Sequence, residues 1–98
     1  MTNHELVDLL KTLSAIYHRE GCFDFDAGIG SMIDLLSRSP DQSGALWQHA
    51  ASSYRTMAVT KSGFSDVYVD AATAQERVLA NIQLDGIRQT LWETFKRA

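Results

Sequence analysis

The spacing of the apolar residues constrains the fold of this chain more than any other feature of its sequence. In the first segment they recur at intervals of three and four, on one side of a helix: Leu6, Leu9, Leu10, Leu13, Ile16 and Tyr17. Thr2 and Glu5 precede this stripe with the spacing of a capping box. Gly21 follows it, where a glycine in the left-handed conformation ends many helices. The sequence therefore predicts a first helix over about 3–20.

A second helix, ending near Ser37, is predicted by the next apolar stripe. Its apolar positions again lie three and four residues apart, at Ile29, Met32, Ile33 and Leu36. Either Asp24 or Asp26 could cap its first turn, because a short carboxylate accepts hydrogen bonds from the free amides there. The connection over 22–26 is therefore expected to be short, aromatic and acidic.

Ser39, Pro40 and Gln42 form another helix start signal. A serine cap, a proline at the first helical position and a glutamine at the third favour a helix that begins here. The apolar face that follows consists of Leu46, Trp47, Ala50, Ala51 and Tyr54, and extends to Met57 if the helix continues. We expect a third helix over about 40–55.

Residues 56–71 lack a helical period and contain the interruption Lys61-Ser62-Gly63. The Val-Tyr-Val run at 67–69 has the composition of a strand, but one short strand has nothing to pair with. We expect one long ordered loop, with an extended stretch or a turn of helix. Loops of this length in a small domain are usually functional or mobile.

Helical spacing returns over about 72–96 and predicts a long last helix, which the pair Asp85-Gly86 could divide in two. Its apolar residues are Val78, Leu79, Ile82, Leu84, Ile87, Leu91, Trp92 and Phe95. The predicted fold is therefore all-α. We expect a compact bundle of four or five helices in a single domain over 1–98, with one long ordered loop over about 56–71 before the C-terminal helix.

The size and composition of the chain exclude several classes of protein. With 98 residues, about 65% of the surface can be buried on folding, which is enough for one core. One cysteine cannot form an internal disulfide. No apolar run approaches the length of a membrane span, and no signal peptide is visible. We therefore expect a cytoplasmic protein that makes no membrane contact.

The acidic residues are concentrated in the first half of the chain. Residues 1–49 contain seven acidic and three basic residues, whereas residues 50–98 contain five and six. The formal net charge of -3 argues against nucleic acid as a partner. A protein partner could recognise this uneven distribution of charge. A solvated acidic face that only keeps the protein soluble would have the same composition.

Two local patterns resemble ligand motifs, and each fails at a required position. Asp24 and Asp26 open like a calcium loop, but Leu35 occupies the position of its closing glutamate. His18 and Cys22 stand four residues apart, yet two ligands do not make a zinc site. No nucleophile motif surrounds any serine or cysteine. We therefore expect no metal, no cofactor and no enzymatic activity.

Aromatic residues alternate with carboxylates in both the 22–26 connection and the 56–71 loop. Rings beside carboxylates are typical of an interface with a basic partner, while the alternative is that these rings pin the loops onto the core. The sequence leaves both interpretations open. The candidate partner-binding residues are Glu20, Asp24, Asp26, Asp34, Phe64, Asp66, Tyr68 and Asp70.

Three short elements of the sequence resemble those of a known family. They are Glu20-Gly21 after the first helix, Gly63-Phe64-Ser65-Asp66-Val67 in the loop, and Asn81, Leu84 and Leu91 in the last helix. On these elements the chain resembles a family of small helical bacterial proteins of the kind encoded beside secreted toxins, where such proteins act as immunity proteins. Lys61-Ser62 departs from the family, whose members often have a glycine-methionine-glycine run there.

The resemblance implies a protein-binding function. We expect an immunity protein that neutralises a cognate toxin by covering its active site with an acidic face, because toxins that act on anionic substrates have basic clefts. The alternative is a small regulatory or structural subunit that acts through homo- or hetero-oligomerisation. Either a monomer or a homodimer fits these expectations.

Overall fold

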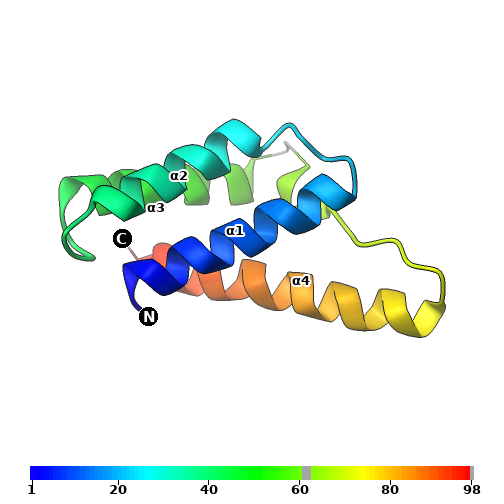
Figure 1. Ribbon diagram of the computed structural model, residues 1–98. Coiled ribbons are helices and arrows are strands. Elements are labelled where there is room, and N and C mark those ends of the chain that lie inside the picture. Colours follow the sequence, from blue (N-terminus) through cyan, green and yellow to red (C-terminus); the bar gives the residue numbers. More distant parts are fainter. Residues whose placement is uncertain (61–62, 98) are drawn as a thin grey trace.

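The computed structural model describes residues 1–60 and 63–97, and within them the chain forms four α-helices and one 3₁₀ helix (Figure 1). They are α1 (Asn3–Arg19), α2 (Asp26–Arg38), α3 (Ala45–Val59), η1 (Phe64–Asp66) and α4 (Ala74–Phe95). Both α1 and α3 pack against α2 and against α4, so the four helices surround one core. No strand occurs among the described residues, and the all-α prediction is confirmed.

The two ends of α1 form as the sequence predicts. Thr2 Oγ1 accepts a hydrogen bond from the Glu5 amide at 3.1 Å, and Glu5 Oε1 accepts one from the Thr2 amide at 3.2 Å. Gly21 has a φ of 74°, a left-handed conformation that glycine adopts at little cost. The first helix is therefore determined by signals close to it in the sequence.

The start of α2 differs from both predicted caps. The helix begins at Asp26, and the N-cap position is occupied by Phe25, whose side chain makes no capping hydrogen bond. Asp26 instead bonds the imidazole of His18 near the end of α1, and Asp24 lies exposed in the connection. The Asp26 carboxylate still stabilises α2, because negative charge is favoured in the first turn of a helix.

The predicted start of the third helix at residue 40 is wrong, because a local turn replaces the first turn of helix. Asp41 Oδ1 accepts hydrogen bonds from the amides of Ser43 and Gly44 at 2.9 and 2.8 Å. A short carboxylate that bonds backbone amides two and three residues further on competes with the helix. α3 therefore begins at Ala45.

The predicted 56–71 loop is shorter than expected. Its first four residues are helical, since α3 continues to Val59. Gly63 then enters η1 with a φ of 90°, which favours glycine, and residues 67–70 have no regular secondary structure. Lys61 and Ser62, where the chain departs from the family that it resembles, lie outside the described residues.

The core contains side chains from all four helices and from η1. Among its largest fully buried members are Tyr17, Tyr54, Phe64 and Phe95. Trp47 is also buried, which confirms the core positions of Trp47 and Tyr54 on the predicted apolar faces, whereas Trp92, also expected in the core, is only half-buried. The bundle is elongated, with principal extents of 44 × 24 × 20 Å.

α4 is one continuous helix, and the Asp85-Gly86 pair does not divide it. Thr73 caps its start by accepting a hydrogen bond from the Glu76 amide at 3.1 Å. Leu84, Ile87, Leu91 and Phe95 lie on the buried side of the helix.

Three apolar residues of α4 lie outside the core, contrary to the apolar face predicted for the last helix. Val78, Leu79 and Ile82 are exposed. A helix of 22 residues is about 33 Å long, and in Figure 1 its N-terminal end reaches past the ends of the other three helices. All three residues also lie on the side of α4 opposite the buried Leu84, Ile87 and Leu91, so the neighbouring helices do not cover their side chains.

Candidate protein-binding site

The segment 63–71 lies against the bundle and is anchored by one aromatic ring. The Phe64 ring lies 5.4 Å from the rings of Tyr17 and Phe25 and 5.7 Å from that of Tyr54, measured between centroids. The Phe64 side chain is 1% exposed. Phe64 was a candidate partner-binding residue, but its ring packs the segment onto the core and a partner cannot touch it.

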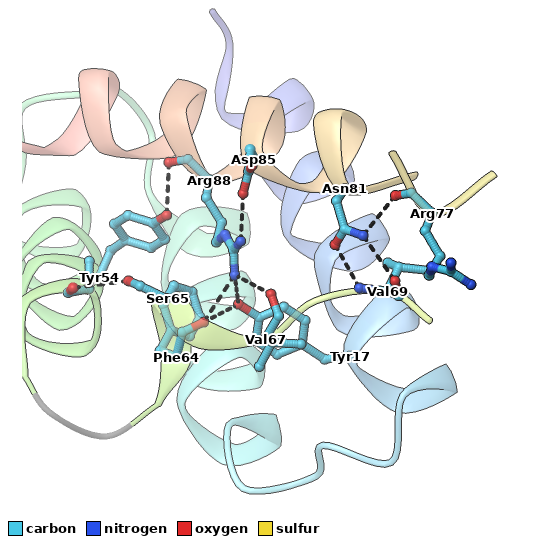
Figure 2. A network of polar contacts seen from close by, with 11 residues as sticks. Tyr17, Tyr54, Phe64, Ser65, Val67, Val69, Arg77, Asn81, Asp85 and Arg88 are labelled. Carbon is cyan, nitrogen blue, oxygen red and sulfur yellow. Dashed lines mark hydrogen bonds and ion pairs between the residues drawn. The ribbon is translucent and has the colours of Figure 1, made fainter. Parts of the chain in front are cut away.

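A second anchor of the segment is Arg88 on α4 (Figure 2). Its Nη1 donates to the backbone carbonyls of Phe64 and Val67 at 3.3 and 2.9 Å, and to the Tyr17 hydroxyl at 3.2 Å. Its Nη2 pairs with Asp85 Oδ1 at 2.7 Å. The Arg88 guanidinium thus donates hydrogen bonds to two carbonyls of the segment and to the Tyr17 hydroxyl of α1. The Asp85 carboxylate balances its positive charge.

The two tyrosines beside Arg88 complete this network. The Tyr17 hydroxyl donates to the Phe64 carbonyl, and the Tyr54 hydroxyl donates to the Arg88 carbonyl at 3.0 Å. Burial raises the pKa of the Tyr17 phenol above its usual value, although the hydrogen bond from Arg88 lowers it. The Tyr17 hydroxyl therefore keeps its proton at neutral pH and remains a donor.

Asn81 holds the next part of the segment, as Figure 2 also shows. Its Oδ1 accepts from the Val69 amide at 2.7 Å, and its Nδ2 donates to the Val69 carbonyl at 2.9 Å. Arg77 Nη1 donates to the Ala71 carbonyl at 2.8 Å. A carboxamide that bonds both polar groups of one residue replaces the neighbouring strand that the Val-Tyr-Val run lacks.

These anchors leave the outer side of the segment open as a groove beside the end of α1. The groove, which we call the acidic groove, is lined by Glu20, Cys22, Gly63, Asp66, Val67, Tyr68 and Asp70. Glu20 Oε1 accepts a hydrogen bond from the Asp70 amide at 2.9 Å, which connects the end of α1 to the segment 63–71. The Tyr68 side chain is 66% exposed. Three carboxylates and one exposed ring thus lie together, and none of the described residues that line the groove is basic.

The structure brings together four of the eight candidate residues. Glu20, Asp66, Tyr68 and Asp70 line the acidic groove, and Phe64 lies buried beneath the segment. The other three acids lie in the 22–26 connection and on α2, where Asp34 pairs with Arg38 at 2.8 Å. Asp24, Asp26 and Asp34 are not among the residues that line the groove.

The spacing of apolar residues did not identify the two residues that hold the groove in shape, and Asn81 was named only as part of the resemblance to a known family. Arg88 lies between Leu84 and Leu91 at spacings of four and three, and Asn81 precedes Leu84 by three. Both polar residues therefore belong to the edge of the apolar stripe. A polar side chain at such a position signals a buried hydrogen-bond partner, because an unpaired one would be costly.

The described part of the chain offers no group of three or more histidine, cysteine, aspartate or glutamate side chains that could hold a metal ion. Across 1–60 and 63–97, likewise, no helix has both the length and the apolar character needed to cross a membrane. Comparison of the chain with family models, with curated proteins and with solved structures gives no match. What the groove recognises must therefore follow from its own shape and charge.

Replacing Asn81 with alanine is expected to release the 67–71 stretch while the bundle stays folded. The Val69 amide loses its acceptor, so its hydrogen exchange should accelerate by about tenfold to a hundredfold. Asn81→Asp is the matched control, because its carboxylate still accepts from the Val69 amide but cannot donate to the carbonyl. Exchange measured by NMR should be intermediate in Asn81→Asp, and an unchanged rate in Asn81→Ala would contradict this role.

Proposed function

We propose that this protein is a protein-binding module whose acidic groove takes up a basic surface of its partner. The observation that carries this proposal is the grouping of Glu20, Asp66 and Asp70 around the exposed ring of Tyr68. Carboxylates attract a basic partner over long distances and accelerate association. An exposed tyrosine supplies a large contact area with little loss of side-chain entropy.

The firm attachment of the segment supports the same function. Phe64, Arg88 and Asn81 fix the backbone from residue 64 to residue 69, so the groove is formed before a partner arrives. Binding to such a surface costs less conformational entropy than binding to a loose loop.

A bacterial immunity protein in the cytoplasm is the specific form of this proposal. A toxin domain that cleaves or modifies an anionic substrate carries a basic cleft, and the acidic groove would cover that cleft and keep the substrate out. The resemblance of the Glu20-Gly21 pair and the 63–67 element to proteins encoded beside toxins favours this form.

Charge reversal in the groove tests the proposal. This form of the proposal requires a toxin gene beside the gene of this chain, and its product, purified with its catalytic residue inactivated, is the probe. Asp66→Lys combined with Asp70→Lys should slow its association by roughly tenfold to a thousandfold and weaken the dependence of the rate on salt. Tyr68→Ala should instead accelerate dissociation, because this substitution removes an aromatic contact and leaves the charge of the acidic groove unchanged.

Asp34→Lys is the matched control for charge. It reverses one carboxylate on α2, outside the acidic groove, so it should leave the rate within about twofold because its charge is screened by salt. Survival of cells that express the active toxin should follow the same order as the association rates. If Asp34→Lys slows association as much as the combined Asp66→Lys and Asp70→Lys variant, or if no variant reduces protection, the groove is not the binding site.

A further inference from the structure

Residues 67–70 are extended and have the side-chain alternation of a single β-strand. The side chains of Val67 and Val69 are half-buried and pack against the core, whereas those of Tyr68 and Asp70 are exposed. A period of two is that of a strand with one face on a core. Val67 also has extended backbone, with a φ of -64° and a ψ of 132°. These four residues, which we call the 67–70 strand, therefore have two edges.

The edge of the 67–70 strand that faces α4 is fully used (Figure 2). The Val67 carbonyl accepts a hydrogen bond from Arg88 at 2.9 Å. The Val69 amide and carbonyl both bond the carboxamide of Asn81. α4 thus takes the place of a neighbouring strand on this side.

The opposite edge borders the acidic groove and is open. In an extended chain the amides and carbonyls of alternate residues point toward the same edge, so those of Tyr68 and Asp70 point away from α4. The Asp70 amide accordingly donates to Glu20 Oε1, which lines the groove, at 2.9 Å. The Tyr68 amide and carbonyl make no hydrogen bond with any described residue. An unpaired amide and carbonyl at the edge of a strand are a template for pairing with another chain.

The charge around this open edge selects a basic occupant. The carboxylates of Glu20, Asp66 and Asp70 line the groove together with the exposed Tyr68. A second copy of this chain would bring the same carboxylates against them, and like charges on paired strands are destabilising. A lysine or arginine side chain is instead attracted to the carboxylates and can stack on the Tyr68 ring. The groove has a volume of about 440 Å³, within the range of ligand sites.

We propose that the acidic groove binds an extended basic segment of the partner by strand addition at Tyr68. The Tyr68 amide would donate to a carbonyl of that segment, and the Tyr68 carbonyl would accept from one of its amides. This inference rests on the proposed function and deepens it, because it names the conformation and the charge of what the partner inserts. Asn81 and Arg88 already hold the 67–70 strand extended, so little backbone entropy is lost on binding.

A peptide without backbone donors tests strand addition on the unmodified protein. The probe is a capped seven-residue peptide of alternating valine and lysine, and its control carries an N-methyl group on every residue. The control keeps the charge and the side chains of the probe. In titrations followed by NMR, it should bind roughly tenfold or more weakly, because it cannot donate to the Tyr68 carbonyl. The Tyr68 amide should exchange its hydrogen about tenfold more slowly when the probe is bound.

Tyr68→Pro tests the other hydrogen bond, with Tyr68→Ala as the matched control. Both variants lack the ring, and only proline lacks the amide hydrogen. The Tyr68 amide has no partner among the described residues, and Val67 has the extended backbone that proline requires before it. Both variants should therefore unfold at the same urea concentration. Tyr68→Pro should bind the probe about fivefold or more weakly than Tyr68→Ala.

The outcomes separate this inference from the proposed function. Asp66→Lys combined with Asp70→Lys should weaken binding of the probe roughly tenfold or more. If it does, but the N-methylated control binds as well as the probe, strand addition is overturned and the proposed function stands. Strand addition is also overturned if the probe does not bind, or if Tyr68→Pro binds it as Tyr68→Ala does; the association rates of the toxin domain then still decide the proposed function. Probe binding that the charge reversal leaves unchanged would contradict both.

Discussion

Phe64→Ala is expected to lower the free energy of unfolding by about 3–5 kcal/mol, the range for removal of a buried phenylalanine ring. The Phe64 ring fills the space between Tyr17, Phe25 and Tyr54, and those three rings belong to different parts of the chain. They cannot all move inward to fill the space. Guanidinium chloride unfolding, followed by circular dichroism, measures the loss.

The same substitution distinguishes the two interpretations that the sequence leaves open for the loop aromatics. If Phe64 pins the loop onto the core, stability and partner binding fall together in Phe64→Ala. Phe64→Leu should retain most of the stability, with a loss of roughly 1–2 kcal/mol, because it keeps most of the buried volume. A Phe64→Ala variant as stable as the unmodified protein would contradict the role of the buried Phe64 ring as an anchor of the loop.

Arg88→Met is expected to cost about 2–3 kcal/mol of stability. Methionine keeps most of the apolar stem but leaves the Val67 carbonyl without the donor at 2.9 Å, and an orphaned buried acceptor costs more than an average hydrogen bond contributes. The Arg88 side chain is 14% exposed, so water replaces the lost donor only in part. Urea unfolding of the purified variant measures this loss.

Arg38→Met is the matched control for the loss of an arginine. Arg38 pairs with Asp34 on the same helix, and both side chains are more than half exposed, so its removal should cost less than about 0.5 kcal/mol. Arg88→Lys should recover part of the stability, because one ammonium group cannot reach all the acceptors of the guanidinium fork. Equal losses in Arg88→Met and Arg38→Met would contradict the role assigned to Arg88.

The candidate site was only partly predictable, and the reason lies in where its supporting contacts come from. The acidic and aromatic character of the loop is visible in the sequence, so Asp66, Tyr68 and Asp70 could be named in advance. The partners of the supporting residues are remote, since Arg88 bonds a tyrosine 71 residues away. The spacing of apolar residues carries no information about such pairs.

Two helix starts illustrate the same limit at short range. The capping box of Thr2 and Glu5 formed because nothing nearby competes with it. The similar signal at 39–42 failed because Asp41 bonds the next amides first. Two local signals of similar strength thus overlapped, and the turn prevailed over the helix.

The sequence by itself determined the all-α class, the order of four helices and most of their limits, because apolar periodicity and caps act within a few residues. Only the tertiary structure decided which side of α4 is buried, because both sides are apolar and the bundle can cover one. It also decided that Phe64 belongs to the core and Tyr68 to the surface. Burial depends on the neighbours that the whole fold supplies, and no local pattern contains them.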